Sequence, residues 1–219
     1  QPKMSNLRYL FTLLAITSLF QISAQEKVVK FSKGHEKVTN TIDQYNFNAQ
    51  DAYFEGYFFR FITLESVPNQ EKLTKFSQNG IQLLEYVPDN TYLAAIPSNV
   101  SKNNLASLGV FSIIDFDNKY KSSKRLDKRD FPDWAYNGPL LNLSVRTFKT
   151  FSFQKTVELL ERFGAKVTLK IPHTSMMNIE VSEKKLAALI SLPFVRFVDL
   201  ISEPGKAESN DGRNLHRSN

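Results

Sequence analysis

Hydrophobic and polar positions follow the same order in two stretches of the chain, and 84 positions separate each residue from its counterpart. Between residues 80 and 115 the apolar positions keep step with those of residues 164–199 without a gap, as Leu83 does with Val167. A repeat of this length indicates a small domain present in two copies. We expect the copies to superpose with Gly80 on Gly164 and Asp115 on Asp199. The identical pairs are Gly80 and Gly164, Pro88 and Pro172, Ser98 and Ser182, Leu105 and Leu189, Ser107 and Ser191, Leu108 and Leu192, and Asp115 and Asp199.

Each copy contains four runs rich in β-branched and aromatic residues, which predict strands. The predicted strands are residues 57–64, 81–87, 91–96 and 110–116 in the first copy, and 140–148, 166–171, 175–181 and 194–200 in the second. A helix should begin near Pro68 and end at Gly80, and its counterpart should run from Ser152 to Gly164. A second helix should follow each hairpin, from Ser98 to Leu108 in the first copy and after Ser182 in the second. The order β-α-β-β-α-β predicts an α+β protein made of two tandem ferredoxin-like plaited domains.

The start of the chain has the composition of a secretory signal peptide. Lys3 and Arg8 are followed by an apolar stretch and then by the small residues Ser23 and Ala24. We predict cleavage between Ala24 and Gln25. The apolar stretch of about twelve residues is too short to span a bilayer, so we expect no stable membrane insertion once it is removed. The protein should be secreted through the periplasm to the cell surface or medium, and the absence of cysteine suggests a bacterial source.

The remaining boundaries follow from changes in composition. A polar leader with little periodicity precedes the first copy, and we expect it to be weakly structured. A charged linker joins the copies; we interpret it as a solvated connector, with a processing site at its basic pairs as the alternative. The predicted segments are the signal peptide 1–24, the leader 25–52, the first plaited repeat 53–118, the linker 119–137, the second plaited repeat 138–201 and an extended tail 202–219.

The two copies differ in the chemistry of one sheet face. In this fold both helices cover the same side, so alternate strand residues face away from them. Alternation assigns to the helix side Phe59, Phe61, Ile81, Leu83, Leu93 and Ala95, and to the helix-free face Phe58, Ile62, Leu84, Tyr86, Tyr92 and Ile96. The helix-free face of the second copy should carry Asn142, Ser144, Arg146, Lys166, Thr168, Lys170, Asn178 and Arg196, with Met176. A large apolar patch is a liability on a monomer, so we expect the first face to be covered by the second copy or by a partner.

No motif of catalysis or of cofactor binding is present. Without cysteine there is no thiolate nucleophile or cysteine-ligated zinc. The three histidines, His35, His173 and His216, form no metal motif, and neither a nucleophile elbow nor a phosphate-binding loop occurs. The net charge of +6 is weak for a nucleic-acid-binding domain, and the strands lack the aromatic motif of RNA-recognition modules. We predict no catalytic residue, no metal, no cofactor and no nucleic-acid partner.

The end of the second copy carries a family resemblance. Residues 181–199 place leucines on a short helix, followed by Leu192, Pro193, Val195, Val198 and Asp199. This run resembles the second half of a subtilisin propeptide inhibitor domain. The first copy matches less well, because Gly109 stands where the proline would be. The doubled layout and the closing segment are similar to the long propeptides of secreted bacterial subtilisin-like serine proteases, especially those of the Bacteroidetes. The resemblance covers residues 53–219.

This resemblance implies that the chain helps a cognate subtilisin-like catalytic domain to fold and then inhibits it. An open sheet face would dock on the protease, and the tail would lie in the substrate cleft as an extended strand. The residues implied in the cleft are Leu215, His216, Arg217, Ser218 and Asn219, with Asn219 in the first subsite as a cleaved product. The alternative is a secreted non-catalytic module for protein binding or assembly that uses the apolar face of the first copy.

Overall fold

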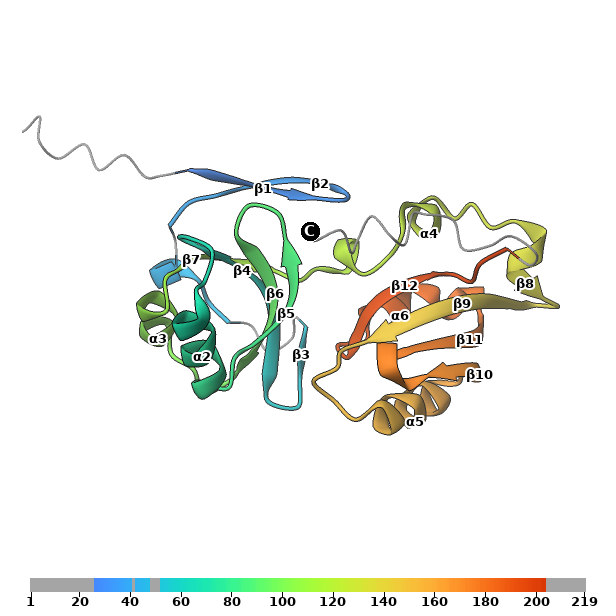
Figure 1. The fold of residues 1–219 in the computed structure, drawn as a ribbon. Coiled ribbons are helices and arrows are strands. Elements are labelled where there is room, and N and C mark those ends of the chain that lie inside the picture. Colours follow the sequence, from blue (N-terminus) through green and yellow to red (C-terminus); the bar gives the residue numbers. More distant parts are fainter. Residues whose placement is uncertain (1–25, 41, 48–51, 204–219) are drawn as a thin grey trace, which may run out of the picture.

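Three antiparallel β-sheets and a few short helices make up the described part of the chain, which is of the mixed α+β class (Figure 1). The structure is a computed structural model and describes residues 26–40, 42–47 and 52–203. The predicted signal peptide with its cleavage site at Ala24 and Gln25 lies outside these residues, as does the predicted cleft segment from Leu215 to Asn219. Within the described part of the chain, no helix is both long and apolar enough to cross a membrane.

The first unit is built around a five-stranded sheet. Its sheet order is β3-β4-β6-β5, with β7 pairing along the same edge of β4 as β3. Helices α2 and α3 lie on one side of this sheet (Figure 1). The elements are β3 (Tyr53–Phe54), β4 (Tyr57–Leu64), α2 (Gln70–Gln78), β5 (Gln82–Val87), β6 (Thr91–Pro97), α3 (Lys102–Ser107) and β7 (Val110–Asp115).

The second unit repeats this arrangement with the sheet order β10-β11-β9-β12 and a short β8 beside β9. Numbered along the chain, the four long strands of each unit therefore lie in the order fourth, first, third, second. The elements are β8 (Tyr136–Asn137), β9 (Leu140–Thr147), α5 (Phe153–Phe163), β10 (Lys166–Ile171), the 3₁₀ turn η5 (Pro172–Thr174), β11 (Met176–Ser182), the 3₁₀ turn η6 (Glu183–Lys185), α6 (Leu186–Ser191) and β12 (Val195–Leu200).

All eight predicted strands are present, each within one residue of its predicted ends. The helices of the first unit are shorter than predicted because their caps lie further along the chain. The side chains of Asn69 and Ser101 accept hydrogen bonds from the backbone of the first turns of α2 and α3, so these helices begin after them rather than near Pro68 and Ser98.

The repeat is maintained with one-residue shifts rather than at a constant spacing. Gly80 and Gly164 correspond as predicted, because each has positive φ after the first helix of its unit. However, β9 begins 83 residues after β4, while β11 and β12 begin 85 residues after β6 and β7. The predicted superposition of Asp115 on Asp199 is therefore wrong. Asp115 lies opposite Arg60, and its counterpart in the second sheet is Leu200.

Small differences in loop length cause these shifts. The hairpin turn has three residues between β5 and β6 but four between β10 and β11. Before the last strand, Gly109 alone follows Leu108, whereas Pro193 and Phe194 both follow Leu192. A change of one residue turns every side chain of a strand to the opposite face, and the faces predicted for β4 and β6 are wrong.

The leader and the linker are both structured, contrary to prediction. The leader forms a hairpin of β1 (Lys27–Phe31) and β2 (Gly34–Val38), followed by the 3₁₀ turn η2 (Ile42–Gln44). Val29 and Val38 of this hairpin are buried against Phe111 of β7. In the linker, Leu126 and Ala135 are buried in the core of the second unit. The linker elements are η3 (Asn118–Tyr120), α4 (Lys124–Lys128), η4 (Asp133–Ala135) and β8.

Candidate functional site

The helix-covered face of the first sheet contains most of the residues that were predicted to face a partner. Phe58, Ile62 and Ile96 are buried in one cluster with side chains of α2 and α3. Tyr92 packs against the same cluster, and the ring of Tyr86 lies 5.2 Å from that of Tyr92. Of the predicted partner-facing set, Phe58, Ile62, Tyr86, Tyr92 and Ile96 are therefore on the wrong face.

Leu84 is the member of that set that lies on the helix-free side, where it packs with a separate cluster. The pairing of β5 with β6 shifts by one residue between Leu83 and Glu85. This bulge changes the alternation within β5, so Leu83 and Leu84 fulfil the prediction while Tyr86 does not. Both faces of this sheet are apolar, so the hydrophobic pattern alone could not identify the face that the helices cover.

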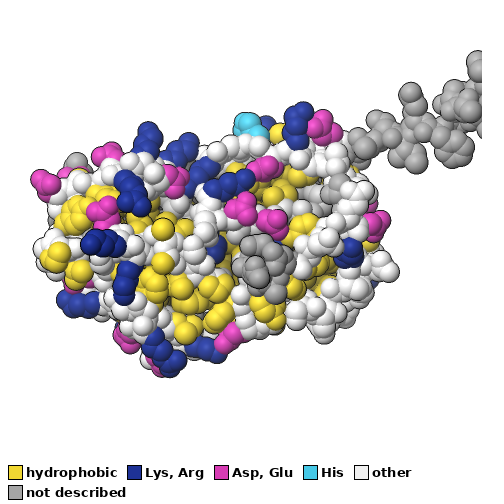
Figure 2. Space-filling model, turned by 180° about the vertical axis from the view of Figure 1, so that it is seen from behind, with side chains coloured by type: hydrophobic (Ala, Val, Ile, Leu, Met, Phe, Trp, Pro, Cys, Tyr) yellow, Lys and Arg dark blue, Asp and Glu magenta, His cyan; other side chains and the backbone are white. Residues whose placement is uncertain are grey.

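The helix-free face of the first sheet is buried inside the chain. Phe59, Phe61, Leu93 and Ala95, which were predicted to face the helices, lie here together with Phe116, and none is more than 5% exposed. This face is turned toward the second unit (Figure 1). From behind, hydrophobic side chains gather where the two units meet (Figure 2). The expectation that the apolar face is covered is confirmed, although its residues differ from those predicted.

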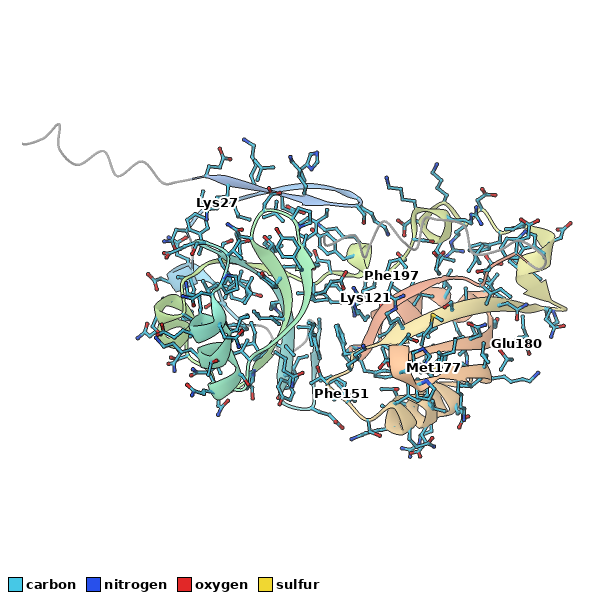
Figure 3. All side chains as sticks on the ribbon, in the orientation of Figure 1. Lys27, Lys121, Phe151, Met177, Glu180 and Phe197 are labelled. Carbon is cyan, nitrogen blue, oxygen red and sulfur yellow. The ribbon has the colours of Figure 1, made fainter. Side chains whose placement is uncertain are left out.

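Three other parts of the chain cover this face. Phe148 and Phe151 follow β9, and the ring of Phe148 stacks on Phe59 with a centroid distance of 3.7 Å. Phe31 of the leader hairpin lies 4.8 Å from the ring of Phe61, and Tyr120 of the linker lies 5.1 Å from it. Phe151 marks the junction of the units in Figure 3. Aromatic pairs of this kind add to the burial of apolar area.

Polar contacts at the edges of this interface hold the covering segments in place. Arg196 of β12 forms an ion pair with Glu85 of β5, and both side chains are largely buried. In the leader hairpin, Lys33 pairs with Asp127 of α4 at 2.6 Å. Burial lowers the pKa of Arg196 to about 10. A salt bridge thus joins the second unit to the first sheet, and another joins the leader hairpin to the linker.

A buried lysine lies in the linker beside the covered face. Lys121 is 2% exposed; its ammonium group donates to the Leu192 carbonyl at 3.2 Å and lies over the ring of Phe116 (Figure 3). Burial lowers its pKa to about 8. The backbone oxygen of Lys121 accepts a hydrogen bond from Val198, and Ser122 forms a parallel bridge there, so the linker covers the outer edge of β12.

The helix-free face of the second sheet is different. Along β9, buried residues that face α5 and α6 alternate with half-buried residues on the other side. Pairing places Met176 and Phe197 on either side of Arg146, and Asn178 and Asp199 on either side of Ser144. Among the residues that the structure describes, no helix or strand packs over these rows, so we take this face as the candidate site. Figure 3 marks Phe197 at its β12 side.

The predicted positions of this second face hold for β9 and β11 but not along the whole of β10. Asn142, Ser144, Arg146 and Asn178 lie on it, with Met176. Lys170 does not, because a register shift between Val167 and Leu169 turns it toward α5, where it pairs with Glu161. Leu169, which the prediction missed, is 48% exposed on this edge strand.

The charges on this face differ in whether they have partners. Lys166 pairs with Glu180 at 2.9 Å, and the hydrogen bonds from Lys166 and Asn137 lower the pKa of Glu180. Burial lowers the pKa of Arg146, and no hydrogen bond or ion pair to its guanidinium group is formed within the described part of the chain. The site thus presents a half-buried cation between two apolar side chains.

Two of the three histidines lie among the residues that the structure describes. No group of histidine, aspartate and glutamate side chains among them could hold a metal ion. His35 lies on β2 and His173 in the turn η5, and both are exposed, while His216 lies outside the described residues. The helix-free face of the second sheet is mostly polar, with Asn142, Ser144, Asn178 and Asp199 among its residues.

One family has a sequence model that matches part of the chain. It is described as Domain of unknown function (DUF8729), and the match covers residues 25–117. The matched segment comprises the leader hairpin and the first unit, which also pack together in the structure. Neither the curated proteins nor the solved structures contain a match to the chain.

Proposed function

We propose that the chain is the propeptide of a secreted bacterial subtilisin-like serine protease, of the Bacteroidetes type. It would act as an intramolecular chaperone and autoinhibitor of the catalytic domain. We further infer that its two units are tandem ferredoxin-like plaited domains. The strand order fourth, first, third, second and the two helices on one side of each sheet support this classification. The run from Leu192 to Asp199, which carries the family resemblance, leads into and forms β12.

One observation carries the assignment of the docking site. The helix-free face of the second sheet has no covering element in the described part of the chain, and β12 of the same sheet leads directly into the tail. From residue 204 to Asn219 an extended chain can reach roughly 50 Å. A protease that docks on this sheet would therefore have the tail within reach of its substrate cleft.

The first unit has a supporting role in this proposal. Its helix-free face is occupied by Phe31, Tyr120, Phe148 and Phe151, so it offers no apolar sheet surface to a partner. The alternative, a binding module that uses that face, loses the surface on which it was based. The first unit and leader hairpin instead hold the linker and one end of the second sheet in a fixed position.

The tail would inhibit as a bound product. An extended segment pairs with the edges of the cleft through backbone hydrogen bonds, and its side chains fill successive subsites. Leu215, His216, Arg217, Ser218 and Asn219 would occupy these subsites, with Asn219 at the cleaved end. The chain would be exported before it acts, and the amino terminus of the mature protein should be Gln25.

The test is inhibition of the subtilisin-like domain encoded downstream in the same reading frame. Residues 25–219 should inhibit it, and removal of Leu215 to Asn219 should raise the inhibition constant at least tenfold, mostly through faster dissociation. A variant with residues 204–208 replaced by glycine and serine at unchanged length is the control and should inhibit like the parent. Absence of inhibition by residues 25–219, or absence of such a domain, would overturn the proposal.

A further inference from the structure

The free face of the second sheet has a charged residue at the centre of an apolar row. Arg146 lies on β9, and its cross-strand neighbours are Met176 on β11 and Phe197 on β12. All three side chains are half-buried. The next row consists of Asn178, Ser144 and Asp199 and is polar.

Among the residues that the structure describes, Arg146 has no partner that balances the cost of its position. Burial penalises its charge and lowers its pKa, yet no carboxylate or carbonyl among the described residues accepts a hydrogen bond from its guanidinium group. Buried charges in proteins are normally paired. The nearest acid in the sheet register is Asp199, beside Ser144, and the two side chains form no ion pair.

The other cations on this side of the sheet are already used within the chain. Lys166 pairs with Glu180, and Arg196 pairs with Glu85 of the first unit. The fold itself does not require an arginine at this position. The corresponding row of the first sheet consists of Thr91, Thr63 and Ser112, which are small and buried.

We infer that Arg146 is the anchor of the docking face and binds a carboxylate that the partner presents within an apolar part of its surface. The inference rests on the proposed function, so the partner is the subtilisin-like catalytic domain. The planar guanidinium group can hold a carboxylate through two parallel hydrogen bonds. Met176 and Phe197 would exclude water from this pair, as apolar residues do around binding hot spots.

The composition of the face favours a protein over other anionic partners. A nucleic acid or a polyanionic surface would require several unpaired cations, whereas this row offers one between two apolar side chains. Ser144 and Asn178 in the next row add neutral hydrogen-bonding groups. Such a mixture of one arginine, apolar contacts and amides is typical of protein interfaces.

The test compares three variants of residues 25–219 as inhibitors of the downstream catalytic domain. Arg146→Met keeps the length and apolar stem and should raise the inhibition constant about thirtyfold. Arg146→Lys keeps the charge but loses the planar guanidinium group, so it should give an intermediate inhibition constant. Arg125→Met, at an exposed site on α4, is the matched control and should inhibit like the parent.

Two further measurements separate docking from folding. The melting temperature of Arg146→Met should equal that of the parent or exceed it, because no intrachain pair is lost. Its inhibition constant should also depend less on salt than the parent's. If the parent inhibits and Arg146→Met inhibits equally well, the anchor is wrong while the proposed function stands. If the parent itself does not inhibit, both fail together.

Discussion

The two sheets share strand order but have opposite chemistry on their helix-free faces. Where the first sheet has Phe61, Leu93 and Ile114 in one row, the second has Ser144, Asn178 and Asp199. The first row is covered by other parts of the chain, whereas no described helix or strand packs over the second. The fold therefore requires apolar residues only on the side of the helices, and the other side reflects what covers it.

The largest expected effect comes from truncating corresponding residues on the two faces. Phe59 is fully buried and stacks on Phe148, so Phe59→Ala should lower the free energy of unfolding by about 3–5 kcal/mol. Asn142 occupies the corresponding place in the second sheet. Asn142→Ala should change the free energy of unfolding by less than about 0.5 kcal/mol. Urea denaturation measures both. Equal losses would show that the two faces do not differ as described.

A smaller effect is expected at the ion pair between the units. Glu85→Gln leaves the largely buried guanidinium group of Arg196 without its carboxylate and should cost about 2 kcal/mol. The double variant Glu85→Gln with Arg196→Met should recover part of this loss, because no unpaired charge then remains. Strictly additive losses in this double-mutant cycle would mean that the two side chains do not interact in solution.

The smallest effect concerns the charge beside the covered face. Lys121→Met should raise the free energy of unfolding at pH 7 by roughly 1–2 kcal/mol, since it removes a buried charge but also the bond to the Leu192 carbonyl. The folded pKa of about 8 lies below the ordinary value of 10.5, so between these pH values the unfolded chain binds more protons. Wild-type stability should therefore rise with pH in that window.

The measurement is the difference in unfolding free energy between Lys121→Met and wild type from pH 7 to pH 10. It should shrink as the pH rises, because the neutral lysine no longer carries the penalty for burial. If the difference in unfolding free energy stays constant over this range, Lys121 is hydrated and the contact between Lys121 and Phe116 is open to water.

Periodicity and turn residues were sufficient to predict the elements of both units. The glycines at positions 80 and 164 mark the ends of the first helices, and the proline turns mark the hairpins. The sheet faces of the first unit could not be predicted, because both are apolar. Small differences in loop length displace β9 and β11 by one residue from the 84-residue spacing of the repeat. The identical residues between the strands keep that spacing and so conceal the displacement.

The leader hairpin and part of the candidate site could not be predicted, because they depend on contacts between residues far apart in the sequence. The leader hairpin is short and mostly polar on its outer side. Its two buried valines pack against Phe111, which is 73 or more residues away in the sequence. The candidate site was predicted in part. The sequence correctly placed Asn142, Ser144 and Arg146 on the helix-free face. It could not show that Arg146 lacks a hydrogen-bonding partner among the described residues, because that depends on which side chains the fold brings near it.

The central claim is that the helix-free face of the first sheet is buried, while no described element covers that of the second, where we propose that a partner docks. Because the chain has no cysteine, single thiols test this directly through their rate of alkylation. Ser144→Cys should react within about tenfold of Ser107→Cys, an exposed control on α3, while Ala95→Cys should react at least a hundredfold more slowly. The downstream catalytic domain should then protect Ser144→Cys and leave Ser107→Cys reactive. Rapid alkylation of Ala95→Cys, or a reactive Ser144→Cys in the complex, would contradict the account.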